Sequence, residues 1–151
     1  MKIIMASDHR GFETKKALIT LLSQKGYEID DTGPSEYNKE DDYPDFVVPA
    51  MKRLQNNPDS MGIIMCKNGV GVNMLANKYK NVRAALCFHK KQAETARTDD
   101  NANVLALPID FLSDEDIWDI VNTFLNTEFS NFDRHKRRLK KVSLVEEENF
   151  K

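Results

Sequence analysis

The sequence predicts an α/β fold in which helices cover both faces of a five-stranded parallel sheet. Five short, continuously apolar runs alternate with segments whose apolar residues recur at helical spacing. Such runs are typical of strands that are buried on both faces, and strands joined through helices form parallel sheets by right-handed crossovers. We therefore expect a three-layer α/β/α sandwich.

The predicted strands and helices follow one another along the chain. Strands are predicted at residues 2–7, 27–32, 61–66, 82–88 and 103–107. Helices are predicted around residues 12–22, 46–54, 72–79, 115–125 and about 131–147. The long polar connection at residues 34–42 is expected to be a solvated loop or a flap. In a Rossmann- or flavodoxin-like sheet, ligands bind beyond the carboxyl ends of the strands, so polar residues there are candidates for a site.

Size and charge narrow the class of protein. The 151 residues fit a single domain, expected to span residues 1–151, and 22 basic against 24 acidic residues give a net charge of −2. We therefore expect a small-molecule ligand, with neither nucleic acid nor a membrane as a partner.

The apolar runs are too short to cross a bilayer and the first residues resemble no cleavable signal, which indicates the cytoplasm. Cys66 and Cys87 are expected to be free thiols, because no Cys/His spacing suggests a metal site.

Three strand ends carry reactive groups: Asp8 and His9 after the first strand, Cys66 after the third, and a polar stretch before the fifth. We expect all three at one edge of the sheet. Gly69 and Gly71 open a helix, so backbone N–H groups there can form an anion pocket beside Cys66. This setting favours a thiolate, and we expect Cys66 to ionise nearer neutral pH than a free cysteine. The alternative is that Cys66 is a small buried residue and that the glycines only turn the chain.

A basic cluster opens the last predicted helix. Arg134 and Arg138 are one helical turn apart, with His135 beside them. Two guanidinium groups at this spacing can hold a phosphate by charge-assisted hydrogen bonds. The alternative is a solvated basic face of the helix.

Taken together, these motifs resemble the ribose-5-phosphate isomerase B family, which includes the two-subunit galactose-6-phosphate isomerases. The resemblance covers nearly the whole chain, with many short matches in the right order. The matching segments are Asp8-His9-x-Gly11-Phe12, Asp42-Tyr43-Pro44, Cys66-x-x-Gly69-x-Gly71, Ala76-Asn77-Lys78, Val82-Arg83-Ala84, Asn103-Val104-Leu105-Ala106 and Arg134-His135-x-x-Arg138.

The resemblance implies interconversion of an aldose phosphate and a ketose phosphate through a 1,2-enediol, with no metal or organic cofactor. Ribose 5-phosphate and ribulose 5-phosphate are the expected pair. Cys66 would move the proton, and the segment from Asn68 to Gly71 would stabilise the enediolate oxygen. A homodimer or a dimer of dimers is also implied. The substrate-binding residues would be Asp8, His9, Tyr43, Gly69, Val70, Gly71, Asn77, Asp100, Arg134, His135 and Arg138.

The chain departs from the family pattern at several positions. Lys67 and Asn68 stand where the family has Gly and Thr, with Asn68 still able to act as a hydrogen-bonding catalytic residue. Asp99 replaces a ring-opening histidine, Asp100 replaces a substrate-binding asparagine, and Asp110 replaces a phosphate-facing arginine. Three acids near the site would repel a phosphate. The alternatives are therefore one subunit of a two-chain hexose-6-phosphate isomerase, which would form a hetero-oligomer, or a non-catalytic sugar-phosphate binding protein.

Overall fold

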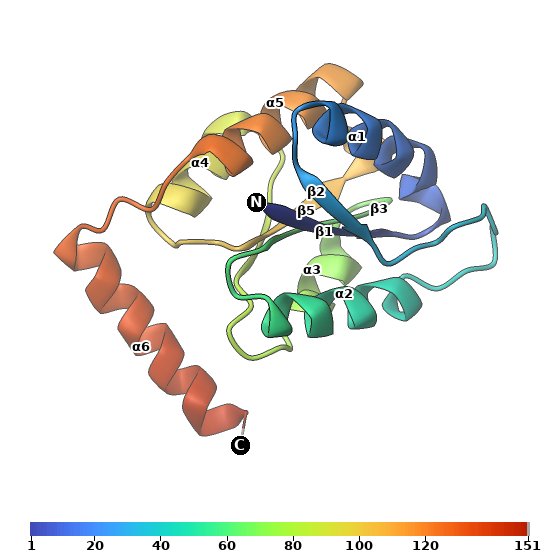
Figure 1. The fold of residues 1–151 in the computed structure, drawn as a ribbon. Helices are drawn as coiled ribbons and strands as arrows, with labels where there is room; N and C mark the ends of the chain where they lie inside the picture. The colour runs from blue at the N-terminus through green and yellow to red at the C-terminus, as the bar shows by residue number, and fades with distance from the viewer. Residues whose placement is uncertain (151) are drawn as a thin grey trace.

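The structure, a computed structural model, describes residues 1–150 and contains one five-stranded parallel sheet. The strand order is β2-β1-β3-β5-β4, and every neighbouring pair is parallel (Figure 1). The three-layer α/β/α architecture predicted from the sequence is thereby confirmed. The strands are β1 (Lys2–Ser7), β2 (Glu28–Asp31), β3 (Met61–Cys66), β4 (Ala84–Leu86) and β5 (Val104–Pro108).

Helices cover both faces of the sheet. Helices α1, α4 and α5 pack on one face, and α2 and α3 on the other. None of the helices in residues 1–150 is both long enough and apolar enough to cross a bilayer. The helices are α1 (Phe12–Gln24), α2 (Pro44–Asn56), α3 (Val70–Ala76), α4 (Lys90–Thr98), α5 (Asp114–Asn126) and α6 (Asp133–Asn149).

Helix α4 was missing from the sequence prediction, which left the last crossover without a helix. Its buried residues are Ala93, Ala96 and Arg97. Two alanines and an arginine give too weak an apolar pattern to mark a helix face. Helix α6 lies close to its predicted position of about 131–147.

Because side chains alternate along a strand, neighbouring residues lie on opposite faces of the sheet. Ile63 and Met65 pack against α1, α4 and α5, whereas Ile64 and Cys66 pack against α2 and α3. Cys66 therefore ends β3 with its thiol on the face that carries α3, the helix that follows it directly.

The parallel register separates two ends of the sheet, called here the carboxyl edge and the amino edge. Cys66 pairs with Pro108 at the carboxyl edge, while Gly62 pairs with Val104 at the amino edge. Residues 99–103 directly precede Val104, so they lie at the amino edge, about 13 Å from Cys66 at roughly 3.3 Å per strand residue. The expectation that this polar stretch shares an edge with Cys66 was wrong, because a segment before a parallel strand and one after it lie at opposite ends.

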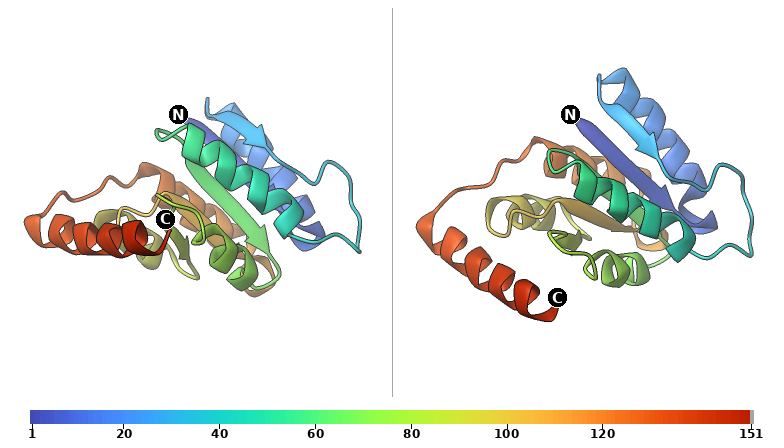
Figure 2. Two further views of the ribbon diagram at one scale, coloured as in Figure 1. Left: turned by 90° about the horizontal axis from the view of Figure 1, so that it is seen from below. Right: turned by 60° about the horizontal axis from the view of Figure 1, so that its bottom comes forward.

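Helix α6 and the loop of residues 34–43 also lie at opposite ends of the molecule. Figure 2 shows the loop beside the carboxyl edge, whereas α6 runs alongside the amino edge, where a side-chain oxygen of Glu146 accepts the backbone N–H of Asn81 at 2.9 Å. The backbone N–H of Ser130 donates to the carbonyl oxygen of Thr98 at 3.1 Å, which ties the start of the α6 segment to the end of α4. Residues carried by α6 therefore belong with Asp99 rather than with Cys66.

Candidate active site

Cys66 is the buried centre of the carboxyl-edge group. Its side chain is almost wholly enclosed, and the thiol lies 3.9 Å from Oδ1 of Asn68, to which it donates. Burial raises the pKa of Cys66, with a smaller contribution from the charge of Asp8, whereas the backbone N–H groups of Val72, Gly69 and Asn68 lower it. The net shift is upward because removal of the thiolate from water costs more than the N–H groups return. The expectation of a thiol that ionises nearer neutral pH was therefore wrong for the isolated chain.

The loop after Cys66 requires glycine at position 69. Gly69 has φ 70°, in the left-handed region, and a Cβ there would lie 2.5 Å from Cδ1 of Leu86. Oδ1 of Asn68 accepts the backbone N–H of Val70 at 3.0 Å, so one amide of the expected anion pocket is already used by the chain itself. Gly71 lies in the first turn of α3, where N–H groups lack an intrahelical acceptor.

Tyr43 joins this group from the start of α2. A Cβ at Gly71 would lie 2.8 Å from the hydroxyl oxygen of Tyr43, so the phenol packs directly against the glycine. This contact places a hydroxyl beside the open end of α3. The sequence motifs around Tyr43 and Gly71 are 28 residues apart by number, and the fold brings them together.

Two carboxylates organise the end of β1. Oδ1 of Asp8 accepts the N–H groups of Arg10 at 3.0 Å and Gly11 at 3.3 Å. Burial raises the pKa of Asp8, although these hydrogen bonds oppose the shift. Oδ1 of Asp41 accepts from the backbone N–H of His9 at 3.0 Å and lies 2.7 Å from Nδ1 of its ring. Asp41 comes from the loop of residues 34–43, which thus contacts the site as a flap would.

Arg10 and Asp110 form an ion pair across the carboxyl edge. Nη2 of Arg10 lies 2.5 Å from Oδ2 of Asp110. The two residues follow β1 and β5, and β3 lies between these strands, so the pair spans the end of the strand that carries Cys66. Because its charge is offset by Arg10, Asp110 does not act as a lone carboxylate facing a bound anion.

A second group of predicted residues gathers at the amino edge. Nε2 of His135 lies 3.8 Å from Oδ1 of Asp99, and Nδ1 of His135 lies 2.7 Å from Oγ of Ser130. His135 is buried, whereas Arg134 and Arg138 are exposed on α6. The guanidinium carbon of Arg134 lies 4.7 Å from the centre of the Phe132 ring.

Asn77 and Asp100 also belong to the amino edge. The amide of Asn77 donates to the carbonyl oxygens of Asn73 and Ala84, each at 3.0 Å, and accepts the N–H of Ala84 at 2.9 Å. These hydrogen bonds join the end of α3 to β4, and they use the side-chain amide of Asn77 for contacts within the chain. Asn77 and Asp100 both line a groove of about 610 Å³ between β4 and α6.

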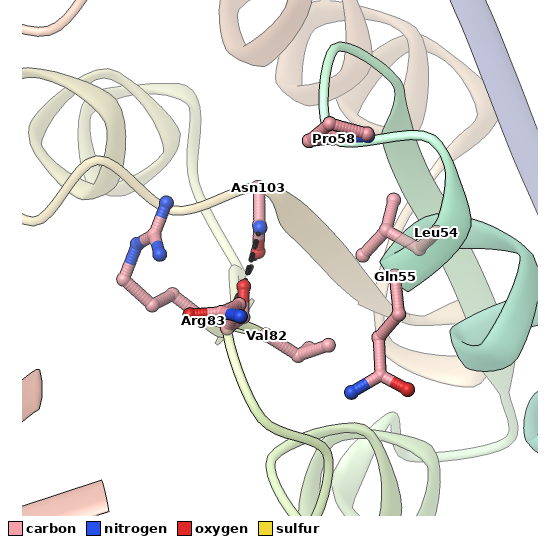
Figure 3. A pocket seen from close by; sticks show the side chains of 7 residues that line it. Leu54, Gln55, Pro58, Val82, Arg83 and Asn103 are labelled. Atoms are coloured by element: carbon pink, nitrogen blue, oxygen red, sulfur yellow. Dashed lines mark hydrogen bonds between the residues drawn. The ribbon is translucent and has the colours of Figure 1, made fainter. Parts of the chain in front are cut away.

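A smaller pocket of about 210 Å³ lies farther along the amino edge (Figure 3). Its polar lining is largely bonded within the chain: the side chain of Asn103 accepts the N–H of Arg83 at 2.8 Å and donates to the carbonyl oxygen of Asn81 at 2.9 Å. Figure 3 shows the Arg83 side chain extending away from Leu54 and Gln55. None of the residues predicted for the site lines this pocket.

Sequence reasoning missed Arg10 and Asp41 as members of the carboxyl-edge group. A signal for Arg10 was present: an arginine stands at the variable position of the Asp-His-x-Gly-Phe segment, and an acid stands at position 110 where the family has an arginine. Asp41 had no such signal, because it is one of several acidic residues in a polar loop and its contact with His9 spans 32 positions.

Comparisons with known proteins give one consistent relationship. A family model described as Ribose/Galactose Isomerase matches residues 3–142. A protein named probable ribose-5-phosphate isomerase B from Mycoplasma pneumoniae is 42% identical over 146 residues, which are 97% of this chain and 95% of that protein. Ribose-5-phosphate isomerase B from Mycolicibacterium paratuberculosis is 35% identical over 92% of this chain and 87% of that protein.

Solved structures agree with the sequence comparisons. The crystal structure of Mycoplasma genitalium ribose-5-phosphate isomerase B with bound ribulose-5-phosphate is 42% identical and matches with a TM-score of 0.94, covering 98% of this chain and 97% of that one. The Clostridium thermocellum enzyme of the same name is 35% identical and matches with a TM-score of 0.92, covering 98% of this chain and 99% of that one. Since the family model and these relatives span almost the whole chain, the chain belongs to the ribose/galactose isomerase family, a family of aldose–ketose isomerases.

Proposed function

We propose that this protein interconverts ribose 5-phosphate and ribulose 5-phosphate through a 1,2-enediol, with Cys66 as the base. The observation that carries the proposal is the placement of Cys66 at the end of β3, where the thiol bonds to Asn68 and the backbone N–H groups of Gly69 and Val72 favour its thiolate. The similarity to the Mycoplasma genitalium enzyme with bound ribulose-5-phosphate supports the choice of sugar.

The arrangement suits proton transfer between two adjacent carbons. The thiolate of Cys66 removes a proton from one carbon and returns it to the next, while the charge that develops on the sugar oxygen needs hydrogen-bond donors. The hydroxyl of Tyr43 packs against Gly71, whose N–H belongs to the first turn of α3, and both groups can serve as donors. Asn68 bridges the thiol and the start of α3, so it positions both partners of the reaction.

The second part of the proposed site comes from another copy of the chain. Within one chain, Asp99, His135 and the arginines of α6 stand at the opposite end of the sheet from Cys66, so a site that uses both groups needs two chains. The groove between β4 and α6 offers a docking surface, because Leu139, Val142 and Val145 line it and β4 is an edge strand. We therefore propose a homodimer of single-domain chains, residues 1–151, which can pair further into a dimer of dimers.

Asp99 and His135 are proposed to open the sugar ring together. An ionised carboxylate can accept a proton but cannot readily donate one. Nε2 of His135 faces Asp99 at 3.8 Å, so an imidazole is available next to the position where the family has its histidine. Arg134 and Arg138, exposed on α6, would hold the phosphate of the sugar bound to the partner chain.

The test is turnover of ribose 5-phosphate by the purified chain in deuterated water. We expect ribulose 5-phosphate to form and solvent deuterium to enter the carbon-bound position. Cys66→Ala should lose both signals, by at least about a thousandfold, because general bases contribute roughly that much. Cys87→Ala is the matched control, since Cys87 is the second buried cysteine and lies at the end of β4.

Two outcomes would contradict the proposal. One is a wild-type chain that turns over no aldose phosphate unless a different chain is added, which would favour the two-chain hexose-6-phosphate isomerase. The other is a Cys66→Ala variant that exchanges deuterium at the wild-type rate, which would remove Cys66 from the chemistry.

A further inference from the structure

The loop of residues 34–43 is fixed to the body of the molecule at both ends. At its start, Nζ of Lys15 donates to the carbonyl oxygen of Pro34 at 3.1 Å, and this lysine is fully buried. At its end, the carboxylate of Asp41 meets His9. Between them, Tyr37 places its ring edge-on to that of His9, with 6.2 Å between the centroids. The loop therefore closes over His9 rather than lying free in solvent.

Asp41 makes an unusual pair of contacts for a loop residue. A single oxygen, Oδ1, meets both the backbone N–H and the ring Nδ1 of His9. The side chain is only 6% exposed, and its second oxygen, Oδ2, is buried without a hydrogen-bond partner among residues 1–150. A buried carboxylate oxygen without a partner costs free energy. Asp41 therefore directs both of its contacts at one residue, His9, which points to a role in orienting that side chain.

The backbone N–H groups of residues 9–11, directly after β1, are all hydrogen-bonded within the chain. Asp8 takes the N–H groups of Arg10 and Gly11, and Asp41 takes the N–H of His9. The three residues whose N–H groups are bonded in this way, His9, Arg10 and Gly11, make up the short 3-10 helix His9–Gly11. A phosphate or sugar hydroxyl that approaches here must therefore be met by side chains, of which the ring of His9 is 23% exposed.

An ionised carboxylate has only acceptors, so its contact with Nδ1 of His9 requires the proton to be on Nδ1. The other ring nitrogen, Nε2, is then the atom left to meet the substrate. Without Asp41, the ring could carry its proton on either nitrogen and could rotate about its side-chain bonds.

We propose that Asp41 is a positioning residue, which fixes the proton on Nδ1 of His9, presents Nε2 to the phosphate-bearing substrate and couples this geometry to closure of the loop of residues 34–43. This role of Asp41 depends on one part of the proposed function, namely that the substrate carries a phosphate. Asp41 acts through His9 and does not touch the reacting carbons, so it governs binding more than chemistry.

Kinetics of Asp41→Ala and Asp41→Asn test the proposal. We expect Asp41→Ala to raise KM for the sugar phosphate about tenfold and to change kcat less than about twofold, because the lost hydrogen bond is to a charged group in a partly buried setting. Asp41→Asn keeps an oxygen that can accept and should recover part of the loss. Glu40→Ala is the matched control, since Glu40 is the exposed neighbour whose carboxylate lies 3.8 Å from Lys39. Equal effects at positions 40 and 41, or an unchanged KM in Asp41→Ala, would overturn the proposal.

A spectroscopic measurement tests the same role without turnover. Nitrogen-15 spectra of the imidazole rings should show the His9 proton on Nδ1 in the wild-type protein, with the signal assigned by its loss in His9→Gln. Added inorganic phosphate should shift the Nε2 signal of His9, and Asp41→Ala should weaken that response about tenfold. A wild-type His9 without a proton on Nδ1, or one that ignores phosphate, would contradict the proposal even if the protein proves to be an active isomerase.

Discussion

The carboxyl edge and the amino edge of the sheet differ in how complete they are within one chain. At the carboxyl edge, Cys66 and Asp8 are buried, and the thiol of Cys66 and Oδ1 of Asp8 have hydrogen-bond partners within the chain. At the amino edge, Arg134 and Arg138 are exposed on α6, and an apolar groove lies between this helix and β4. The difference teaches that one chain buries the residues proposed for proton transfer, whereas it exposes the arginines proposed to bind the phosphate.

The largest expected effect comes from mixing two variant chains, one with Cys66→Ala and one with both Arg134→Ala and Arg138→Ala, at a sugar-phosphate concentration well below the wild-type KM. If the site combines one edge from each chain, half of the mixed dimers are hybrids and each hybrid has one intact site. Activity should then return to about a quarter of the wild-type value, at least about 25-fold above either variant alone if each arginine contributes tenfold or more. Measuring turnover after co-expression checks this. A mixture no more active than its components would show that the two edges never share a site.

A second expectation concerns pH and the buried thiol at the carboxyl edge. Burial raises the pKa of Cys66 above its ordinary value of 9.0, so the reactive thiolate grows about tenfold per pH unit below that point. The ratio kcat/KM should therefore rise nearly a hundredfold between pH 7 and 9, a range in which a phosphate ester is already fully ionised. A plateau below pH 8 would indicate that the assembled dimer lowers the pKa of this thiol again.

Removing one guanidinium at the amino edge should weaken binding without slowing chemistry. Arg134→Ala should raise KM for a sugar phosphate by about 10- to 100-fold, because a charge-assisted contact is lost. The same variant should bind the unphosphorylated sugar almost as well as the wild type does. Arg137→Ala is a suitable control on the same helix. Equal losses for both ligands would mean that Arg134 supports α6 rather than the phosphate.

A smaller effect is expected at Asp99. Asp99→Asn keeps the size of the side chain and removes its charge, so turnover of a cyclic substrate should fall about tenfold if the carboxylate works with His135 in ring opening. An aldose phosphate too short to cyclise should be unaffected. If Asp99→Asn and Asp99→His both leave turnover of the cyclic substrate unchanged, position 99 plays no part in the reaction.

The smallest effect should follow from Asp110→Asn. The carboxylate of Asp110 is paired with Arg10, so removing it frees a cation near the site instead of relieving a lone repulsion. We expect KM for the sugar phosphate to fall by only about two- to threefold. A tenfold fall would mean that Asp110 faces the substrate directly. Asp114→Asn, at the start of α5, serves as the control.

The sequence allowed much of the sheet to be predicted and less of the site. Strands at residues 2–7 and 61–66 were placed correctly because their apolar runs are unbroken and buried on both faces. Helix α4 was missed because its inward residues are small or charged. The glycine pattern after Cys66 pointed to the tight loop, whose close contact with Leu86 explains why glycine is needed at position 69.

Two features of the site could not be predicted from local pattern. The contact between Asp41 and His9 depends on how a long loop folds back, and no periodicity encodes it. The separation of Asp99 from Cys66 follows from strand direction: a residue before a parallel strand and a residue after one cannot share an edge. Whether a residue lies before or after a strand therefore decides its edge of the sheet, and residue type and spacing alone do not reveal this.

The burial of Cys66 has a consequence for chemical durability. Peroxides and alkylating reagents attack thiolates far faster than thiols. Because burial holds the pKa of Cys66 above its ordinary value and raises that of Cys87 to about 12, both sulfurs are protonated in the resting protein at neutral pH. The proposed base is thus expected to resist oxidation, and cysteine-directed inhibitors should label this protein slowly unless they resemble the sugar and bind in its place.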